Sequence, residues 1–97
     1  MTDHVRDNAE RGRYELPAGN ATAFAEYIPA GDVRIVTHTE VPRAVSGRGI
    51  GSTLVRGMLE DMRARGLRIA PRCSFVVDFI RRHPEYADLR AEPGPRP

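Results

Sequence analysis

The sequence contains no lysine, and this absence removes several kinds of chemistry. All 15 basic residues among the 97 are arginines. A Walker-type phosphate loop needs a Lys followed by Ser or Thr, so no such loop is present. Pyridoxal-dependent and aldolase-type reactions form a Schiff base on a lysine amine, and they are excluded as well. Any phosphate-binding loop in this chain is therefore expected to hold its ligand mainly through backbone groups.

Cysteines, basic clusters and long apolar runs are also scarce. The single Cys forbids a disulfide within the chain, and the three His are too scattered to give metal-ligand spacing. The arginines are spread among 13 acidic residues for a net charge of +2, which argues against a nucleic-acid partner. No apolar run nears the roughly 18 residues of a membrane helix, and no signal-peptide pattern occurs. We therefore expect a cytoplasmic protein with no metal and no membrane partner; the composition leaves the oligomeric state open.

Short strand-like segments separated by turn-forming residues fill the first half of the chain. From the length we expect one domain with one core over residues 1–90, and a flexible tail rich in Pro at 91–97. The regular spacing of the turns favours an antiparallel meander. The predicted strands are residues 4–7, 13–16, 22–28 and 33–41, with a further short strand at 67–70.

The segment 33–41 has the clearest strand pattern. Strict alternation predicts that the odd-numbered residues from Val33 to Val41, including Thr39, share one face of the sheet. His38 and Glu40 are then expected on the other face. Two polar, titratable side chains on one face near the end of a strand are candidates for chemistry.

The central feature of the sequence is a glycine-rich loop followed by an amphipathic helix. Glycines alternate through residues 47–52, and apolar residues recur every four positions from Ile50 to Met62 before Gly66 ends the helix. Such a loop at a helix N-terminus exposes backbone N–H groups at the positive end of the helix dipole, which suits a phosphate. The dinucleotide pattern G-x-G-x-x-G fails, because its last position falls on Ser52. The alternative interpretation is a tight turn that only lets the helix pack on the sheet.

The order strand, loop, helix and strand predicts a crossover that places 67–70 parallel to 33–41. A second helix follows, in which Phe75 and Phe79 are interpreted as core residues because their spacing matches a helical stripe. The expected fold class is α+β: a mostly antiparallel mixed sheet of about five strands, two main helices and a central strand-loop-helix-strand crossover. Ligands in such sheets bind where strand ends meet a helix N-terminus, which here is the junction of 33–41 with 47–52.

Four segments in the same order resemble the short, single-domain family of GNAT-like N-acetyltransferases. They are His-Thr-Glu-Val-Pro at 38–42, Gly-Arg-Gly-Ile-Gly-Ser at 47–52, Cys-Ser-Phe-Val at 73–76 and His-Pro-Glu-Tyr at 83–86. The glycine loop is similar to that of GNAT enzymes generally, and the other three segments are more particular to the short family. The resemblance covers roughly residues 5 to 89.

The resemblance implies an acetyl-CoA-binding fold that transfers acetyl to an amine acceptor, whose identity it leaves open. The CoA pyrophosphate would lie on 47–52 and the pantetheine arm beside the strand 33–41. GNAT loops usually begin with Arg or Gln where this chain has Ser46, so Arg43 or Arg48 would supply the missing charge. The chain is also shorter than a typical GNAT enzyme, so the helices that usually wall the acceptor site are expected to be absent. The cofactor-binding residues expected on this basis are Val41, Arg43, Ser46, Gly47, Arg48, Gly49, Ile50, Gly51 and Ser52.

Acetyl transfer needs a polarised thioester carbonyl, a base for the amine and a proton for the departing thiol. A backbone N–H near Glu40 or Val41 would serve the first need as an oxyanion donor. Glu40 or His38 would act as the base, directly or through water. Cys73, expected at a helix N-terminus that favours the thiolate, would accept the acetyl group from CoA and pass it on. The competing interpretations are a solvated carboxylate, a structural histidine and a small buried cysteine.

Two other functions remain open at this stage. A non-catalytic acyl-CoA-binding or regulatory module would also bind CoA, but it would release no free thiol in the presence of an amine. An RNA- or DNA-binding sheet would show binding that falls steeply with salt, and the strands lack the interleaved aromatic residues that such a sheet uses.

Overall fold

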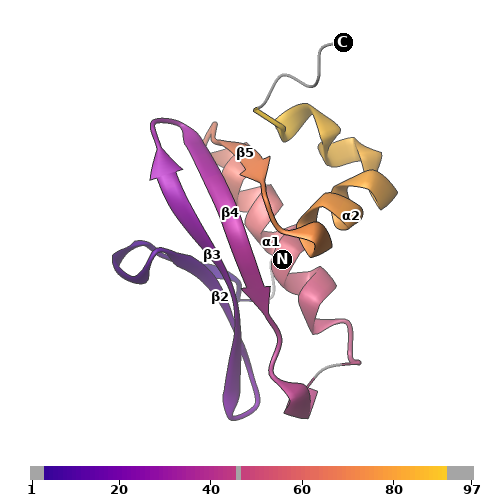
Figure 1. Cartoon of the computed structure of the whole chain (residues 1–97). Coiled ribbons are helices and arrows are strands. Elements are labelled where there is room, and N and C mark those ends of the chain that lie inside the picture. The colour runs from indigo at the N-terminus through magenta and orange to yellow at the C-terminus, as the bar shows by residue number, and fades with distance from the viewer. Residues whose placement is uncertain (1–3, 46, 92–97) are drawn as a thin grey trace.

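A five-stranded mixed sheet forms the centre of the structure, a computed structural model that describes residues 4–45 and 47–91 (Figure 1). The strands lie in the order β1-β2-β3-β4-β5; the first four are antiparallel, and β5 runs parallel to β4. The predicted fold class and the crossover are therefore confirmed. The elements are β1 (Arg6–Asn8), β2 (Arg13–Ala18), β3 (Ala21–Ala30), β4 (Val33–Glu40), α1 (Ile50–Ala64), β5 (Arg68–Pro71) and α2 (Ser74–Arg82), with short 3₁₀ helices at Ala9–Arg11, Arg43–Val45 and Pro84–Leu89.

Helix α1 carries the apolar stripe that the sequence predicts, and it packs across the sheet. Leu54, Met58 and Met62 are completely buried on this stripe. They pack in one core with Tyr14 and Val36 from the sheet and with residues of α2. Burying a side chain of this size contributes roughly 1.5–3 kcal/mol. The stripe therefore fixes α1, and with it the loop at its N-terminus, across the sheet, chiefly against β2 and β3.

A β-bulge in β4 changes which residues face the helices. Glu26 pairs with His38 and Tyr27 pairs with Val36, so Thr37 is an extra residue with no register partner on β3. The strict alternation predicted for this strand is therefore wrong beyond the bulge. Thr39 faces the helices together with Val36, whereas His38 and Glu40 lie on the opposite face.

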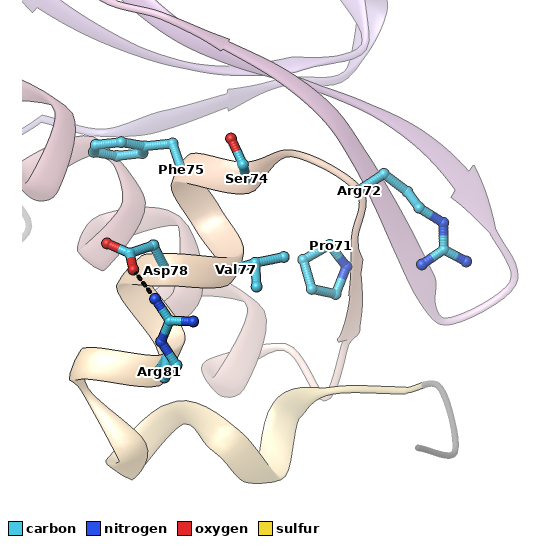
Figure 2. A pocket seen from close by; sticks show the side chains of 7 residues that line it. All are labelled: Pro71, Arg72, Ser74, Phe75, Val77, Asp78 and Arg81. Atoms are coloured by element: carbon cyan, nitrogen blue, oxygen red, sulfur yellow. Dashed lines mark hydrogen bonds and ion pairs between the residues drawn. The ribbon is translucent and has the colours of Figure 1, made fainter. Parts of the chain in front are cut away.

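The structure also corrects one core prediction on α2. Phe79 is buried, with 3% of its surface exposed, but Phe75 is 39% exposed. The buried stripe consists of Val76, Phe79 and Ile80, so it begins one residue after Phe75. Phe75 instead lies beside the start of α1 (Figure 2). An exposed aromatic ring at this place belongs to the surface of the candidate site.

The C-terminal segment returns to the sheet before it leaves the described part of the chain. Pro84 begins the 3₁₀ helix after α2, as its fixed backbone angle suits. Ala91 donates its backbone N–H to the Ile69 carbonyl at 2.8 Å. The remainder of the tail predicted to be flexible, residues 92–97, lies outside the described residues. Within the part of the chain that the structure describes, no helix is long and apolar enough to cross a membrane.

A polar network joins the far end of α1 to the first three strands. The Tyr14 hydroxyl donates to Asp61 at 2.7 Å, and Arg65 bonds both Asp61 and Asp7, at 2.8 and 2.9 Å. Asp7 in turn accepts from the Tyr27 hydroxyl. Both tyrosine rings are buried, so each hydroxyl needs this partner.

Alkaline pH is expected to weaken this network. Burial, with a hydrogen bond to Asp7, raises the pKa of Tyr27 to about 12, above the value near 10 of an unfolded chain. The folded protein therefore holds this proton more tightly. The contribution to stability is complete below about pH 10 and is lost as the pH rises through about 12. Tyr27→Phe should cost about 1–2 kcal/mol at neutral pH and make the alkaline decline shallower.

The measurement is urea denaturation followed by circular dichroism at several pH values from neutral to strongly alkaline. The Tyr27→Phe variant keeps Tyr14, whose pKa burial also raises, so some decline should remain. A variant whose stability fell as steeply with pH as that of the unmodified chain would contradict this role of Tyr27.

Candidate active site

Two glycines shape the loop before α1 because the backbone there is left-handed. Gly47 has φ = 87° and Gly49, the N-cap of α1, has φ = 74°. L-residues with a Cβ rarely adopt this conformation. Gly49 has no side chain that could cap the first N–H groups of α1, and the first turn of the helix carries no acidic residue. The first N–H groups of a helix have no partner within the helix. The positive end of α1 is therefore open to an anionic ligand.

Gly51 has a different reason to be glycine. A Cβ atom at this position would lie 2.9 Å from Cζ of Phe75 and 3.4 Å from Cγ2 of Val41. The missing side chain lets the first turn of α1 approach both α2 and the residue that follows β4. The loop, the end of β4 and the start of α2 thus meet at one place.

The other residues predicted to bind CoA surround this junction. Arg43 begins the 3₁₀ helix between β4 and the loop, and it is exposed, as are Arg48 and Ser52. Ile50 is half-buried against the core. Ser46, where GNAT loops usually carry Arg or Gln, lies outside the described residues. Two exposed arginines therefore lie in the segment between β4 and α1.

A gap opens beside β4 where β5 ends. The two strands pair only from Val33 to Val36, and Arg72 then donates its backbone N–H to the Val36 carbonyl at 2.9 Å. The chain turns away there into α2, while β4 continues to Glu40 (Figure 1). In the described ranges, no strand pairs with residues 37–40 on this side of β4. This strand edge can therefore pair with an extended ligand through backbone hydrogen bonds.

Cys73 lies at the start of α2, on the same side of the sheet as this gap. It is the N-cap residue, half-buried, and its Sγ atom is 3.5 Å from the Thr39 hydroxyl oxygen. Burial raises the pKa of the Cys73 thiol. Hydrogen bonding to Thr39 and to the nearby backbone N–H groups of Val76 and Phe75 lowers this pKa by more, so the net pKa lies below its usual value. The start of α2 therefore favours the thiolate of Cys73.

His38 and Glu40 form a pair on the opposite face of the sheet. His38 Nε2 lies 2.9 Å from Glu40 Oε1, and each side chain is about half exposed, at 52% and 53%. The structure brings these two predicted residues together, but the sheet separates their side chains from Cys73, which contacts Thr39 on the helix face. Phe24 and Glu26 of β3 lie opposite them in register. This face can meet an acceptor without passing α1 or α2.

A shallow groove of about 820 Å³ lies along α2 and the end of β5 (Figure 2). It combines an exposed aromatic ring with charged side chains, and its Arg81 forms an ion pair with Asp78. Its lining residues are Pro71, Arg72, Ser74, Phe75, Val77, Asp78 and Arg81. No sequence pattern indicated this groove, because four of these residues precede or open α2 and only the turn after β5 brings them together.

Sequence reasoning also missed Thr39, the residue in contact with Cys73. Simple alternation correctly predicted that Thr39 lies on the face opposite His38 and Glu40. It also predicted that Thr39 shares a face with Val33 and Ile35, which is wrong because of the bulge. The segment 38–42 contained Thr39, but nothing in it signalled a contact 34 positions away. Across the described residues, no three His, Cys, Asp or Glu side chains gather as a metal site.

Comparisons with known proteins bear on the family and the fold of the chain. The family described as GCN5-related N-acetyl-transferase matches residues 13–89 of the chain, which include the loop, β4, Cys73 and both helices. Among solved structures, a GCN5-like protein from Staphylococcus aureus, determined by NMR, superposes with a TM-score of 0.69. It is 20% identical, and the match covers 99% of this chain and 95% of that one, so it supports the fold. A search of curated proteins finds no match. The chain belongs to the GCN5-related N-acetyltransferase family.

Proposed function

We propose that the protein transfers the acetyl group of acetyl-CoA to an amine acceptor. The observation that carries the proposal is the meeting of three features: the open N-terminus of α1, the unpaired edge of β4, and the thiol of Cys73. Each suits one part of the donor. The first binds an anion, the second pairs with an extended chain containing amides, and the third is a nucleophile for a thioester.

In this proposal the donor lies across the helix side of the sheet. Its diphosphate accepts hydrogen bonds from backbone N–H groups at 47–52, and Arg43 and Arg48 add positive charge where Ser46 lacks it. The pantetheine amides pair with the edge of β4 between Thr37 and Glu40. The thioester then reaches the gap beside Cys73, where a backbone N–H near Glu40 or Val41 polarises its carbonyl.

The proposed transfer has two steps through Cys73. The thiolate attacks the acetyl carbonyl carbon, a new carbon–sulfur bond forms, and the bond to the CoA sulfur breaks; the departing thiolate then takes a proton from water. The acceptor amine next attacks the acetyl carbon, and the Cys73 thiolate is released. The proton lost by the amine goes to the His38–Glu40 pair through water at the unpaired edge of β4, because the sheet separates this pair from Cys73. Exchange between two sulfurs is nearly balanced in energy, so the first step needs little driving force.

A second candidate is a non-catalytic acyl-CoA-binding module. The observation in its favour is the exposure of His38 and Glu40 on a sheet face that carries neither α1 nor α2, so these helices give the acceptor no wall. Both candidates require CoA to bind. They differ in whether an amine increases the consumption of acetyl-CoA.

The deciding experiment measures free thiol released from acetyl-CoA by the purified protein, with and without a panel of amines. An enzyme should release thiol faster in the presence of at least one amine class, such as a polyamine, an amino acid or a lysine-containing peptide. Binding of CoA by calorimetry, without any amine-dependent release across the panel, would favour the binding module. Failure to bind CoA at all would overturn both candidates.

A further inference from the structure

We infer that Thr39 is a positioning residue for Cys73: its hydroxyl holds the sulfur at the edge of the β4 gap and stabilises the thiolate there. This inference rests on the proposed role of Cys73 in acetyl transfer. It begins from the contact between the Thr39 hydroxyl oxygen and Sγ of Cys73, which are 3.5 Å apart although they are 34 residues apart in sequence.

The bulge in β4 is what makes this contact possible. Thr37 occupies an extra position, so Thr39 pairs with Ala25 and faces the helices, as Val36 does before the bulge. Without the extra residue, Val36 and His38 would share a face and the imidazole would point toward α2 instead. The bulge thus places a small hydroxyl beside the thiol and sends the His38 imidazole to the opposite face.

Both partners of the contact are held by regular structure. Thr39 is fixed by its pairing with Ala25 on β3, and its β-branched side chain has few rotamers in a strand. Cys73 is fixed as the N-cap of α2, where its carbonyl accepts from the N–H groups of Val76 and Val77 at 3.1 and 3.0 Å. A hydrogen bond between two such groups loses little conformational entropy when the thiolate forms.

The contact serves both protonation states of the sulfur. In the neutral protein either atom can be the donor. Once the thiol loses its proton, the hydroxyl donates to the negative sulfur, and a hydrogen bond to a charged group is stronger than one to a neutral group. Burial, Thr39 and backbone N–H groups dominate the pKa of Cys73, and no charged side chain ranks with them. Removal of the hydroxyl should therefore be visible in the reactivity of the thiol.

The test is the rate at which iodoacetamide alkylates Cys73 as a function of pH, measured without CoA. Cys73 is the only cysteine in the chain, so the readout is unambiguous. Thr39→Val keeps the branched shape and removes the hydroxyl; it should slow alkylation at neutral pH by about tenfold or more, the loss expected for a hydrogen bond to a charged group. Thr39→Ser keeps the hydroxyl and should stay close to the unmodified protein. Thr22→Val, a matched change on β3 opposite Pro17, should have no effect.

Two results would overturn the inference: an unchanged pH profile in folded Thr39→Val, or equal profiles for Thr39→Ser and Thr39→Val. If Thr39→Val does not fold, the pair Thr39→Ser and Thr39→Ala makes the same comparison, and equal rates would again overturn it. The alkylation needs no CoA, so it can fail while acetyl transfer holds. Conversely, CoA binding and thiol release by the unmodified protein test the proposed function without reference to Thr39.

Discussion

Gly49→Ala is expected to lower the affinity for CoA by at least about tenfold. Gly49 is the N-cap of α1 with a left-handed backbone, and an alanine there costs about 1–2 kcal/mol unless the loop moves. The loop can relax only by turning the first N–H groups of α1. Each charge-assisted hydrogen bond lost to the diphosphate is worth about 1.5–3 kcal/mol, or tenfold and more in affinity. Isothermal titration calorimetry with CoA is the measurement.

Gly31→Ala provides a matched control for this experiment. Gly31 has φ = 64° in the turn between β3 and β4, and like Gly49 it has no heavy atom within 4 Å of an added Cβ. The two variants should therefore lose similar stability in urea denaturation. Only Gly49→Ala should lose affinity for CoA. Equal CoA affinities in the two variants would show that the loop is merely a turn, the alternative that the sequence left open.

The backbone path near the site could be predicted from the sequence because it depends on local signals. Alternating glycines before a four-residue apolar repeat predict a tight loop and a helix, and the structure has Gly47 and Gly49 in left-handed conformations there. The parallel crossover followed from the order of elements. These features depend on residues that are neighbours in the chain.

The side-chain arrangement could not be predicted in the same way, because it depends on distant partners. The bulge at Thr37 is set by how β4 pairs with Glu26 and Tyr27 of β3, and no alternation within β4 reports an extra residue. Phe75 fits a helical stripe by spacing, but only the position of α1 decides that its ring meets Gly51 instead of the core. The separation of His38 and Glu40 from Cys73 follows from the first of these two effects.

Cys73→Ser is expected to abolish the acetyl adduct and to slow amine-dependent thiol release by roughly a hundredfold or more. A serine hydroxyl at neutral pH is a far weaker nucleophile than a cysteine with a lowered pKa. The same substitution should not weaken the fold. Cys73 is the N-cap of α2, where serine is among the preferred residues, and stability should stay equal or rise by up to about 1 kcal/mol.

This opposition of effects separates a chemical role of Cys73 from a structural one. Intact-protein mass spectrometry after mixing with acetyl-CoA and rapid quenching should find one added acetyl group on the unmodified chain and none on Cys73→Ser. Ser74→Ala, which changes the neighbouring exposed residue, should keep the adduct. If Cys73→Ser released thiol at the rate of the unmodified protein, the thiol would be no more than a cap of α2. Transfer would then be direct from CoA to the amine, with His38 and Glu40 as the base, and Glu40→Gln would become the variant that stops turnover.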